Sequence, residues 1–491
     1  MPKRIKRPRV LRFFGRTRKS EAKTYTDYLE EARRLDNERG LIAWQNDPVS
    51  DDYDYGLIQR SLDTLKSYRK ESRFLDLAFY LRQALARNLG NIGNPALYSI
   101  CRSGTKNLIH EYVSEVVSAL NFLTDESIPG FSRKEKIKLI TDIKNSYGRT
   151  AILLSGGGTL GLFHLGVVQA LWNEGLLPRI FSGSSIGSLM AALVGTRDDK
   201  EIRSTFNPEN LNLDVWRYGT FSEIKHHKVA FNQDHFGQCI RQDIGDFTFA
   251  EAYEKTGRVI NISVTCASGN HETRLLNHLT TPHIVIWSAC LASCAMIGVF
   301  PPTGMVQKNR QGMIVPYMHH LQWFDGSLKN DLPMRRLAEL FNVNFHIVSQ
   351  ANPHVFPFLS PKSKPSFLRR ATMDHAVATL KHHARHGVDM AHRLARGTRW
   401  DRILGSVLGV IDQKYEGHIT ITPPVHLPSI LKAFSHLSTD DARRLITWGE
   451  QATWEHMAQI HNQTKIAQTL ERCQRRLRNP GVRILSTEMG L

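Results

Sequence analysis

The amino-acid sequence predicts an α/β fold in which buried strands alternate with helices between residues 148 and 353. Residues 151–155 form a short apolar run before a glycine-rich loop, and apolar residues at helical spacing follow that loop. A second apolar run at 179–182 leads directly into a glycine turn and a helix at 188–194. The remaining strands expected in this part of the chain lie at 258–264 and 345–348.

The turn Gly183-Ser184-Ser185-Ile186-Gly187 joins the second strand to its helix, which is the setting of a nucleophile elbow. In an elbow the serine sits on a strained turn, and close neighbouring backbone leaves no room for a Cβ at Gly183 or Gly187. Ser185 is therefore the candidate nucleophile. The pentapeptide alone is a moderate signal, because it should occur by chance roughly 0.2 times in a chain of this length.

The glycine-rich segment from Gly156 to Gly161 links the first strand to a helix. A loop of this kind presents free backbone N–H groups and the positive end of the helix dipole to an anion, so it suits either a phosphate cradle or an oxyanion hole. No Gly-Lys-Ser/Thr follows it, as a nucleotide P-loop requires. Gly156, Gly158 and Gly161 have the spacing of a dinucleotide fingerprint, but a well-placed acidic residue on a second strand is missing. The elbow on the next strand favours an oxyanion hole built from Gly156, Gly157 and Gly158 over a dinucleotide site or a structural turn.

A third motif, residues 322–327, ends an apolar strand with Asp325 and Gly326. A serine hydroxyl needs a base within hydrogen-bond reach before it can attack an ester, and Asp325 can be that base. The alternative is an ordinary turn aspartate, because Asp-Gly is a common turn signal. His320 and Asp325 also form a His-x4-Asp string of the type found in glycerolipid acyltransferases, which we expect to lie on the strand entering the turn.

These motifs together resemble the patatin-like acylhydrolases, and the resemblance is closest to the fungal and plant triacylglycerol lipases associated with lipid droplets. It implies a three-layer α/β/α core, with helical N- and C-terminal extensions and a Ser-Asp dyad that uses no histidine. Carried over by motif, Ser185 is the nucleophile, Asp325 the base, and the backbone of Gly156 to Gly158 the oxyanion hole. The supporting glycines are Gly161, Gly183, Gly187 and Gly326. The similar stretches are 89–95, 148–168, 325–334, 348–354 and 412–421.

The chain divides into four expected regions. Residues 1–20 form a basic disordered tail, and residues 21–147 have the periodicity of a helical N-terminal extension. Residues 148–353 form the patatin-like catalytic core. Residues 354–491 are expected to be mostly helical, with a returning strand near 419–422.

The 491-residue chain carries a formal net charge of +18, and much of the excess lies near its start. Nine lysines and arginines between Lys3 and Lys19 precede the first acidic residue, Glu21, and apolar residues that include Phe13 and Phe14 interrupt them. This pattern favours binding to anionic lipid headgroups at a membrane or droplet surface. A solvated tail and an import signal are the alternatives. No nucleic-acid recognition motif accompanies the charge.

The six cysteines show no CxxC spacing, which indicates reduced thiols in an intracellular protein. The basic N-terminus lacks the apolar core of a signal peptide. Residues 284–300 are uncharged but fall short of the ~20 apolar residues of a membrane span. The resemblance to the patatin-like family implies a buried helix there instead. The histidines at 375, 382, 383 and 386 are explained by an exposed helix face, and His164 by packing. No metal and no organic cofactor are implied.

The sequence thus predicts a serine acylhydrolase that cleaves long-chain glycerolipid esters, with triacylglycerol as the expected substrate. Its expected location is peripheral, on a lipid droplet or the cytosolic face of the endoplasmic reticulum membrane. A phospholipase A or a lysophospholipid acyltransferase is the alternative among enzymes, because a lipid hydroxyl can replace water in the second step. A non-catalytic lipid-surface scaffold is the alternative from another class. The sequence identifies no protein partner.

Overall fold

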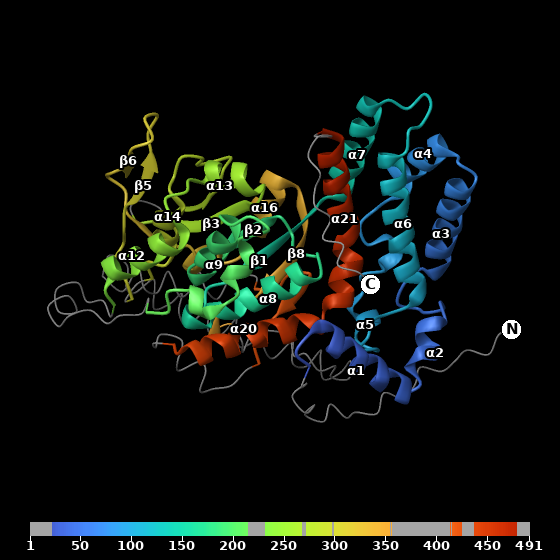
Figure 1. The fold of residues 1–491 in the computed structure, drawn as a ribbon, viewed down its shortest axis with the longest axis horizontal. Helices are drawn as coiled ribbons and strands as arrows, with labels where there is room; N and C mark the ends of the chain where they lie inside the picture. The colour runs from blue at the N-terminus through green and yellow to red at the C-terminus, as the bar shows by residue number, and fades with distance from the viewer. Residues whose placement is uncertain are drawn as a thin grey trace, which may run out of the picture.

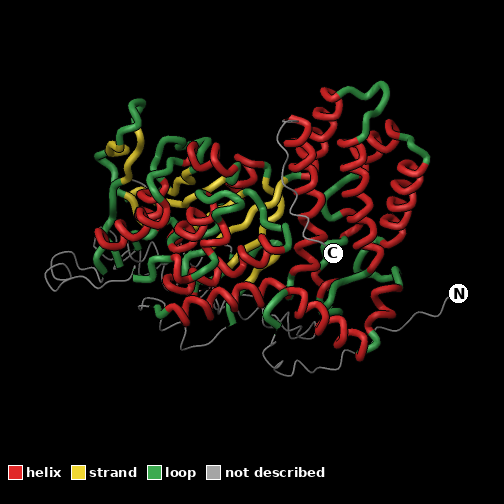
Figure 2. The backbone as a smooth tube through the Cα atoms, viewed as in Figure 1, coloured by secondary structure: helices red, strands yellow, loops and turns green. Residues whose placement is uncertain are grey.

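The computed structural model describes residues 22–214, 231–267, 272–296, 299–353, 355, 413, 415–424 and 437–478. Figure 1 shows a part that contains the sheet and, beside it, a bundle of helices. Figure 2 shows the strands in the part of the molecule beside this bundle, whereas the bundle itself is drawn as helices and loops. The expected basic tail at 1–20 and the histidines at 375–386 lie outside the described residues.

The central sheet has seven strands in the order β4-β3-β2-β1-β8-β9, and β7 also pairs with β3. β1, β2, β3, β8 and β9 run parallel, whereas β4 and β7 run antiparallel to β3. The strands expected at 151–155, 179–182, 258–264 and 345–348 are confirmed. The bounds are β1 Arg149–Leu154, β2 Ile180–Gly183, β3 Val259–Cys266, β4 Thr273–Leu276, β7 Trp323–Asp325, β8 Val343–Ser349 and β9 Ile419–Ile421, with a separate hairpin of β5 Met305–Lys308 and β6 Ile314–Tyr317.

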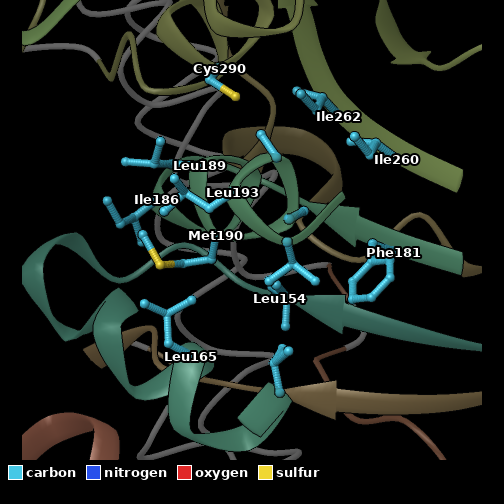
Figure 3. Packing of buried hydrophobic residues seen from close by; sticks show 14 of the residues in the cluster. Leu154, Leu165, Phe181, Ile186, Leu189, Met190, Leu193, Ile260, Ile262 and Cys290 are labelled. Carbon is cyan, nitrogen blue, oxygen red and sulfur yellow. The ribbon is translucent and has the colours of Figure 1, made fainter. Parts of the chain in front are cut away.

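Helices cover both faces of the sheet, because alternate side chains of each strand point to opposite sides. In β1, Ile152 and Leu154 face the core shared with α8, α9 and α14, while Ala151 and Leu153 face α16. The predicted three-layer arrangement is therefore present. Figure 3 shows side chains of α9 packed against those of the neighbouring strands and helices. The helices of this part are α8 Leu162–Asn173, α9 Ile186–Gly195, α10 Ile202–Thr205, α12 Gln233–Ile244, α13 Phe249–Thr256, α14 Ile286–Ser293, α15 Ser327–Asn330 and α16 Met334–Phe341.

The helical bundle combines the two ends of the described chain. α21 (Met457–Arg478) packs through Ile466, Leu470 and Cys473 into the same core as the helices that precede the sheet. It lies beside α7 and α6 in Figure 1. The helices that precede the sheet are α1 Tyr25–Glu38, α2 Leu41–Asn46, α3 Tyr55–Lys70, α4 Phe74–Ala84, α5 Pro95–Tyr98, α6 Asn107–Asp125 and α7 Arg133–Tyr147. Of these, α3 to α7 contribute buried apolar side chains to the core shared with α21, whereas Tyr25 and Tyr28 of α1 pack against the core on the sheet side.

Arg87 joins the bundle to the sheet. Its guanidinium donates to the carbonyl oxygens of Tyr147 at 3.2 Å and Gly148 at 3.1 Å, where α7 ends and β1 begins. It also donates to the carbonyl of Gln463 in α21 at 2.8 Å. The planar fork of arginine suits this task, because it can serve several acceptors at once. Through Arg87, one side chain fixes the start of β1 against the C-terminal helix.

A close helix contact fixes α8, which begins at the glycine-rich loop. α20 (Thr439–Trp454) crosses α8 where Gly166 faces Gly449. A Cβ on Gly449 would lie 2.1 Å from the carbonyl oxygen of Phe163, and one on Gly166 would lie 1.8 Å from that of Ile446. Only glycine allows the two backbones to approach this closely. The position of α8 therefore depends on its contact with α20, which comes from the C-terminal part of the chain.

We predict that Gly449→Ala destabilises the protein by about 1–3 kcal/mol, the usual cost of overpacking. Gly237→Ala is the matched control, because Gly237 also lies inside a helix, α12, but its Cβ would meet Leu291 at an ordinary 3.4 Å. Alanine is the better helix former at both sites, so Gly237→Ala should be neutral or stabilising. Thermal unfolding measures both variants. Equal melting temperatures would show that α8 and α20 are not held by this contact.

Candidate active site

Ser185 lies between β2 and α9 with φ 52° and ψ −130°, a backbone conformation that residues other than glycine seldom adopt. Hydrogen bonds hold it there: the Ser185 N–H donates to Ser293 Oγ at 2.9 Å, and the Ser188 hydroxyl donates to the Ser185 carbonyl at 2.6 Å. Ser293 in turn donates to the carbonyl of Ser263 at 2.8 Å. The turn is thus anchored to α14 and, through it, to β3. This geometry is that of a nucleophile elbow.

The elbow glycines stand where backbone segments touch. A Cβ on Gly183 would lie 2.2 Å from the Gly187 carbonyl oxygen, and one on Gly187 would lie 2.1 Å from the Leu154 carbonyl oxygen at the end of β1. Gly161 faces the Ile186 side chain, where a Cβ would lie 2.4 Å from Cγ1. These glycines let the start of α9 contact the end of β1.

The pairing of β7 explains how Asp325 reaches the same place. Val264 of β3 pairs with Arg274 on one side and with Asp325 on the other. β2 pairs with the earlier residues of β3, from Val259 to Ile262, and ends at Gly183. β7 therefore occupies the position beyond the end of β2 along the same edge of β3. Since Ser185 follows β2 directly, the sheet brings the serine and the aspartate together.

Asp325 is completely buried. Its Oδ1 accepts from the Ser327 N–H at 2.8 Å, and its backbone N–H donates to the Ala295 carbonyl at 3.1 Å. Its Oδ2 has no partner within normal hydrogen-bond geometry among the described residues. Burial raises the pKa of Asp325 to about 6, while the hydrogen bonds from Ser327 and the proximity of the Ser185 hydroxyl partly offset that rise. The site thus holds a carboxylate with one uncommitted oxygen in reach of the serine.

Gly326 allows the turn after Asp325. A Cβ there would lie 2.3 Å from the carbonyl oxygen of Ser263, so the Asp325 turn sits directly on β3. Gln413 also holds this turn, because its amide donates to the Ser327 carbonyl at 2.9 Å.

The glycine-rich loop lies beside the elbow. A Cβ on Gly156 would be 3.5 Å from the Ser185 Cβ, and one on Gly157 would be 2.8 Å from the Ala351 carbonyl oxygen. Gly158 has a left-handed φ of 59° and begins the short helix η2 (Gly158–Gly161) that leads into α8. The Gly156 N–H donates to Asp331 Oδ1 at 3.1 Å. The structure gives the Gly157 and Gly158 amides no acceptor in the part of the chain that it describes.

Neither nearby histidine is placed as a base. His164 is buried on α8, with Nδ1 2.7 Å from Ser349 Oγ and Nε2 3.0 Å from the Ser155 carbonyl, and burial lowers its pKa to about 4. It is a packing residue, as predicted. His320 is exposed in a turn, and only Trp323–Asp325 forms the strand. The expectation that the His-x4-Asp string lies on a strand is wrong, because the chain leaves β6 through an irregular segment before pairing with β3.

Sequence reasoning missed four polar residues around the site: Ser293, Asp331, Asn352 and Gln413. Asp331 and Asn352 fall within stretches that resemble the family, but nothing in their local sequence shows that they meet at the glycine-rich loop. Gln413 also falls within such a stretch, 412–421, whereas Ser293 does not, and both come from segments far from the elbow in the chain. Their contacts depend on tertiary structure.

No group of three or more histidine, cysteine, aspartate or glutamate residues able to hold a metal occurs in the described ranges. All six cysteines are buried, and none is paired with another. The segment 284–300 contains α14, which is only 8 residues long. Among the described helices none has the length and apolar character needed to cross a bilayer.

Two family profiles match the chain: "Domain of unknown function (DUF3336)" over residues 11–145 and "Patatin-like phospholipase" over residues 152–338. The second range contains the glycine-rich loop, the elbow and Asp325.

Curated relatives match nearly the whole chain. Triacylglycerol lipase SDP1L of Arabidopsis thaliana is 37% identical over 94% of this chain and 58% of that protein. In Schizosaccharomyces pombe, triacylglycerol lipase ptl2 is 33% identical over 92% of this chain and 74% of that protein, and triacylglycerol lipase ptl3 is 32% identical over 91% and 94%. The chain therefore spans a little over half the length of the plant relative and nearly all of ptl3. This chain belongs to the patatin-like phospholipase family, within the group that includes these lipases.

Proposed function

We propose that this protein is a serine acylhydrolase that cleaves triacylglycerol with a Ser185-Asp325 dyad. One observation carries the proposal. β7 places the fully buried carboxylate of Asp325 just beyond the end of β2, the strand that leads to Ser185. A non-catalytic scaffold would have no need for a strained serine beside a buried acid. Strain of this kind costs about 1–3 kcal/mol and persists where function requires it.

The reaction follows from the geometry in two steps. Asp325 takes the proton of the Ser185 hydroxyl as the serine oxygen attacks the ester carbonyl, and the glyceride alcohol leaves with that proton. Water then attacks the acyl-serine and gives a proton to Asp325, which passes it to the Ser185 oxygen as the acyl–serine bond breaks, so that the fatty acid leaves and the Ser185 hydroxyl and the Asp325 carboxylate are restored. Catalytic hydrogen bonds are often loose before substrate binds, which agrees with the uncommitted Oδ2 of Asp325.

The glycine-rich loop supplies the oxyanion hole in this mechanism. Because the Gly156 N–H is committed to Asp331, the donors are narrowed to the amides of Gly157 and Gly158. Both lie near the start of η2 and α8, where the helix dipole adds positive potential. Each such donor typically contributes about 10²- to 10³-fold in turnover.

The substrate assignment rests on the relatives, which are named triacylglycerol lipases. The family description, patatin-like phospholipase, keeps phospholipid ester cleavage as a second candidate. Resolution of the acyl-enzyme by a lipid hydroxyl would give lysophospholipid acyltransferase activity at the same site.

We further propose that the protein acts peripherally on lipid droplets or the cytosolic face of the endoplasmic reticulum membrane, with residues 1–20 contacting anionic headgroups. Support comes from the nine basic residues of that segment and the apolar residues among them. Each basic residue near an anionic surface contributes about 1 kcal/mol.

Ser185→Ala should remove hydrolysis of triacylglycerol emulsions while leaving the melting temperature near that of the wild type, because only the nucleophile is lost. Release of fatty acid from triacylglycerol and phospholipid emulsions measures the activity and ranks the two substrates. A fluorophosphonate probe should label the wild type and Ser118→Ala, whose exposed serine lies on α6, but not Ser185→Ala. Labelling of Ser185→Ala would identify a different nucleophile.

Asp325→Asn should cost as much activity as loss of the serine, since members of a catalytic unit are not additive. The wild-type kcat/KM should fall as the pH drops through about 6, because burial raises the pKa of Asp325 to that value and only the ionised carboxylate accepts a proton. His320→Ala, at an exposed position, is the control and should keep full activity. A pH profile flat from 5 to 8 would exclude Asp325 as the base.

Removal of residues 1–20 should leave hydrolysis of a soluble short-chain ester unchanged and weaken flotation with anionic liposomes. Flotation of the full chain should also weaken as salt rises, since exposed charges are screened beyond a Debye length of about 8 Å at physiological ionic strength. Equal, salt-insensitive flotation of the two proteins would show that another surface contacts the lipid.

A further inference from the structure

A second carboxylate, Asp331, is buried behind the oxyanion loop with 1% of its surface exposed. It follows α15, six residues after Asp325, and takes no part in the proton transfers described above. Its Oδ1 accepts from the Gly156 N–H at 3.1 Å, and its Oδ2 accepts from Asn352 Nδ2 at 3.1 Å. Both carboxylate oxygens are therefore engaged by donors.

The backbone of Asp331 is fixed as firmly as its side chain. Its N–H donates to Gln413 Oε1 at 2.7 Å, and its carbonyl accepts from the Ser184 hydroxyl at 2.9 Å. Asp331 thus contacts the glycine-rich loop, the elbow, the segment after β8 and the segment before β9. A buried carboxylate is costly unless fully hydrogen-bonded, so an apolar residue would fill this space at lower cost if filling were its only purpose.

Hydrogen bonds on both sides of Gly156 hold its backbone in one conformation. On one side of Gly156, the N–H is directed at Asp331. On the other, the Gly156 carbonyl accepts from Ser155 Oγ at 2.8 Å, and Ser155 Oγ accepts from the Ala351 N–H at 2.9 Å. Because a peptide unit is planar, a fixed Gly156 carbonyl also fixes the Gly157 N–H on the opposite side of the same plane.

We propose that Asp331 is a positioning residue of the oxyanion hole: it accepts from the N–H on one side of Gly156 while Ser155 holds the carbonyl on the other, and together these bonds keep Gly156 in the backbone conformation that directs the Gly157 and Gly158 amides toward the oxyanion formed on Ser185. This inference rests on the proposed acylhydrolase function. Asp331 itself does not touch the substrate. Its contribution is made only as charge develops in the transition state, so it should affect kcat far more than KM.

The test compares Asp331→Ala, Asp331→Asn and the exchange Asp331→Asn with Asn352→Asp. Alanine removes the acceptor for Gly156. Asparagine keeps an oxygen for Gly156, and Asn352 can turn its amide to pair with the new NH2 group. The exchange keeps the same atoms and the same net charge while moving the carboxylate to the other side of the pair. Gln59→Ala, which alters an exposed side-chain pair with Asp63 in α3, is the control.

Steady-state hydrolysis of a soluble p-nitrophenyl ester should show kcat of Asp331→Ala reduced about 10²- to 10³-fold with KM changed less than about threefold. Asp331→Asn and the exchange should keep kcat within about tenfold of the wild type. Circular dichroism and melting temperature establish that each variant is folded. If Asp331→Ala does not fold, Asp331→Asn and the exchange still test the proposal. Both keep an acceptor for the Gly156 N–H, so a kcat reduced 10²-fold or more in both folded variants would overturn the acceptor role of Asp331.

Labelling by a fluorophosphonate separates failure of this inference from failure of the proposed function. Failure of the function would appear as a wild type whose Ser185 is not labelled. Failure of the inference would appear as a labelled wild type together with a folded Asp331→Ala variant whose labelling rate and kcat both equal those of the wild type. A parallel rise of KM with loss of kcat would also overturn it, since that pattern indicates general damage to substrate binding.

Discussion

The contact between the start of α9 and the end of β1 is the constraint on which the site depends. It exists because Gly183 and Gly187 carry no Cβ, so that the elbow backbone can lie against the Leu154 carbonyl. The Ser184 N–H donates to that same carbonyl at 3.2 Å, which closes the turn onto the sheet. With the turn fixed, the backbone of Ser185 is held in one conformation, and α9 begins at the next residue, Ile186. The glycine-rich loop continues from the end of β1 and lies beside Ser185.

Sheet topology supplies the second half of the proposed dyad. A short antiparallel strand, β7, fills the edge of β3 left open where β2 ends. This arrangement needs β2 to stop after Gly183, as the elbow does, and it leaves Asp325 at the end of its own strand. Ser293 links the two halves, since its hydroxyl bridges the Ser185 amide and the Ser263 carbonyl of β3. The proposed nucleophile and the proposed base are therefore fixed to one strand, β3, through separate contacts.

The parts that could be predicted from sequence are those with local signals. Apolar runs mark the strands, and glycines mark the tight turns where a Cβ does not fit. Ser185, Asp325 and the glycine-rich loop could therefore be predicted as candidates from the sequence. The supporting polar residues have no such signal. Gln413 reaches Asp331 across 82 residues, and Arg87 reaches Gln463 across 376. The packing of α21 against the N-terminal helices likewise depends on apolar helix faces, and such a face does not show in the sequence which other helix it packs against.

In the proposed mechanism, burial is what lets an aspartate act as the base without histidine. An exposed aspartate, with a pKa near 3.8, is too weak a base to attract a serine proton, whereas burial raises the pKa of Asp325 to about 6. This makes it roughly a hundredfold more basic and still leaves it largely ionised at pH 7. The same exclusion of water strengthens the attraction between the developing oxyanion and the loop amides. His164, whose pKa burial lowers to about 4 and whose two nitrogens are already engaged, shows that this environment suppresses an imidazolium. In such a site a carboxylate is the base whose charge changes in the useful direction, because proton transfer removes a buried charge from Asp325 as a new one forms on the substrate oxygen.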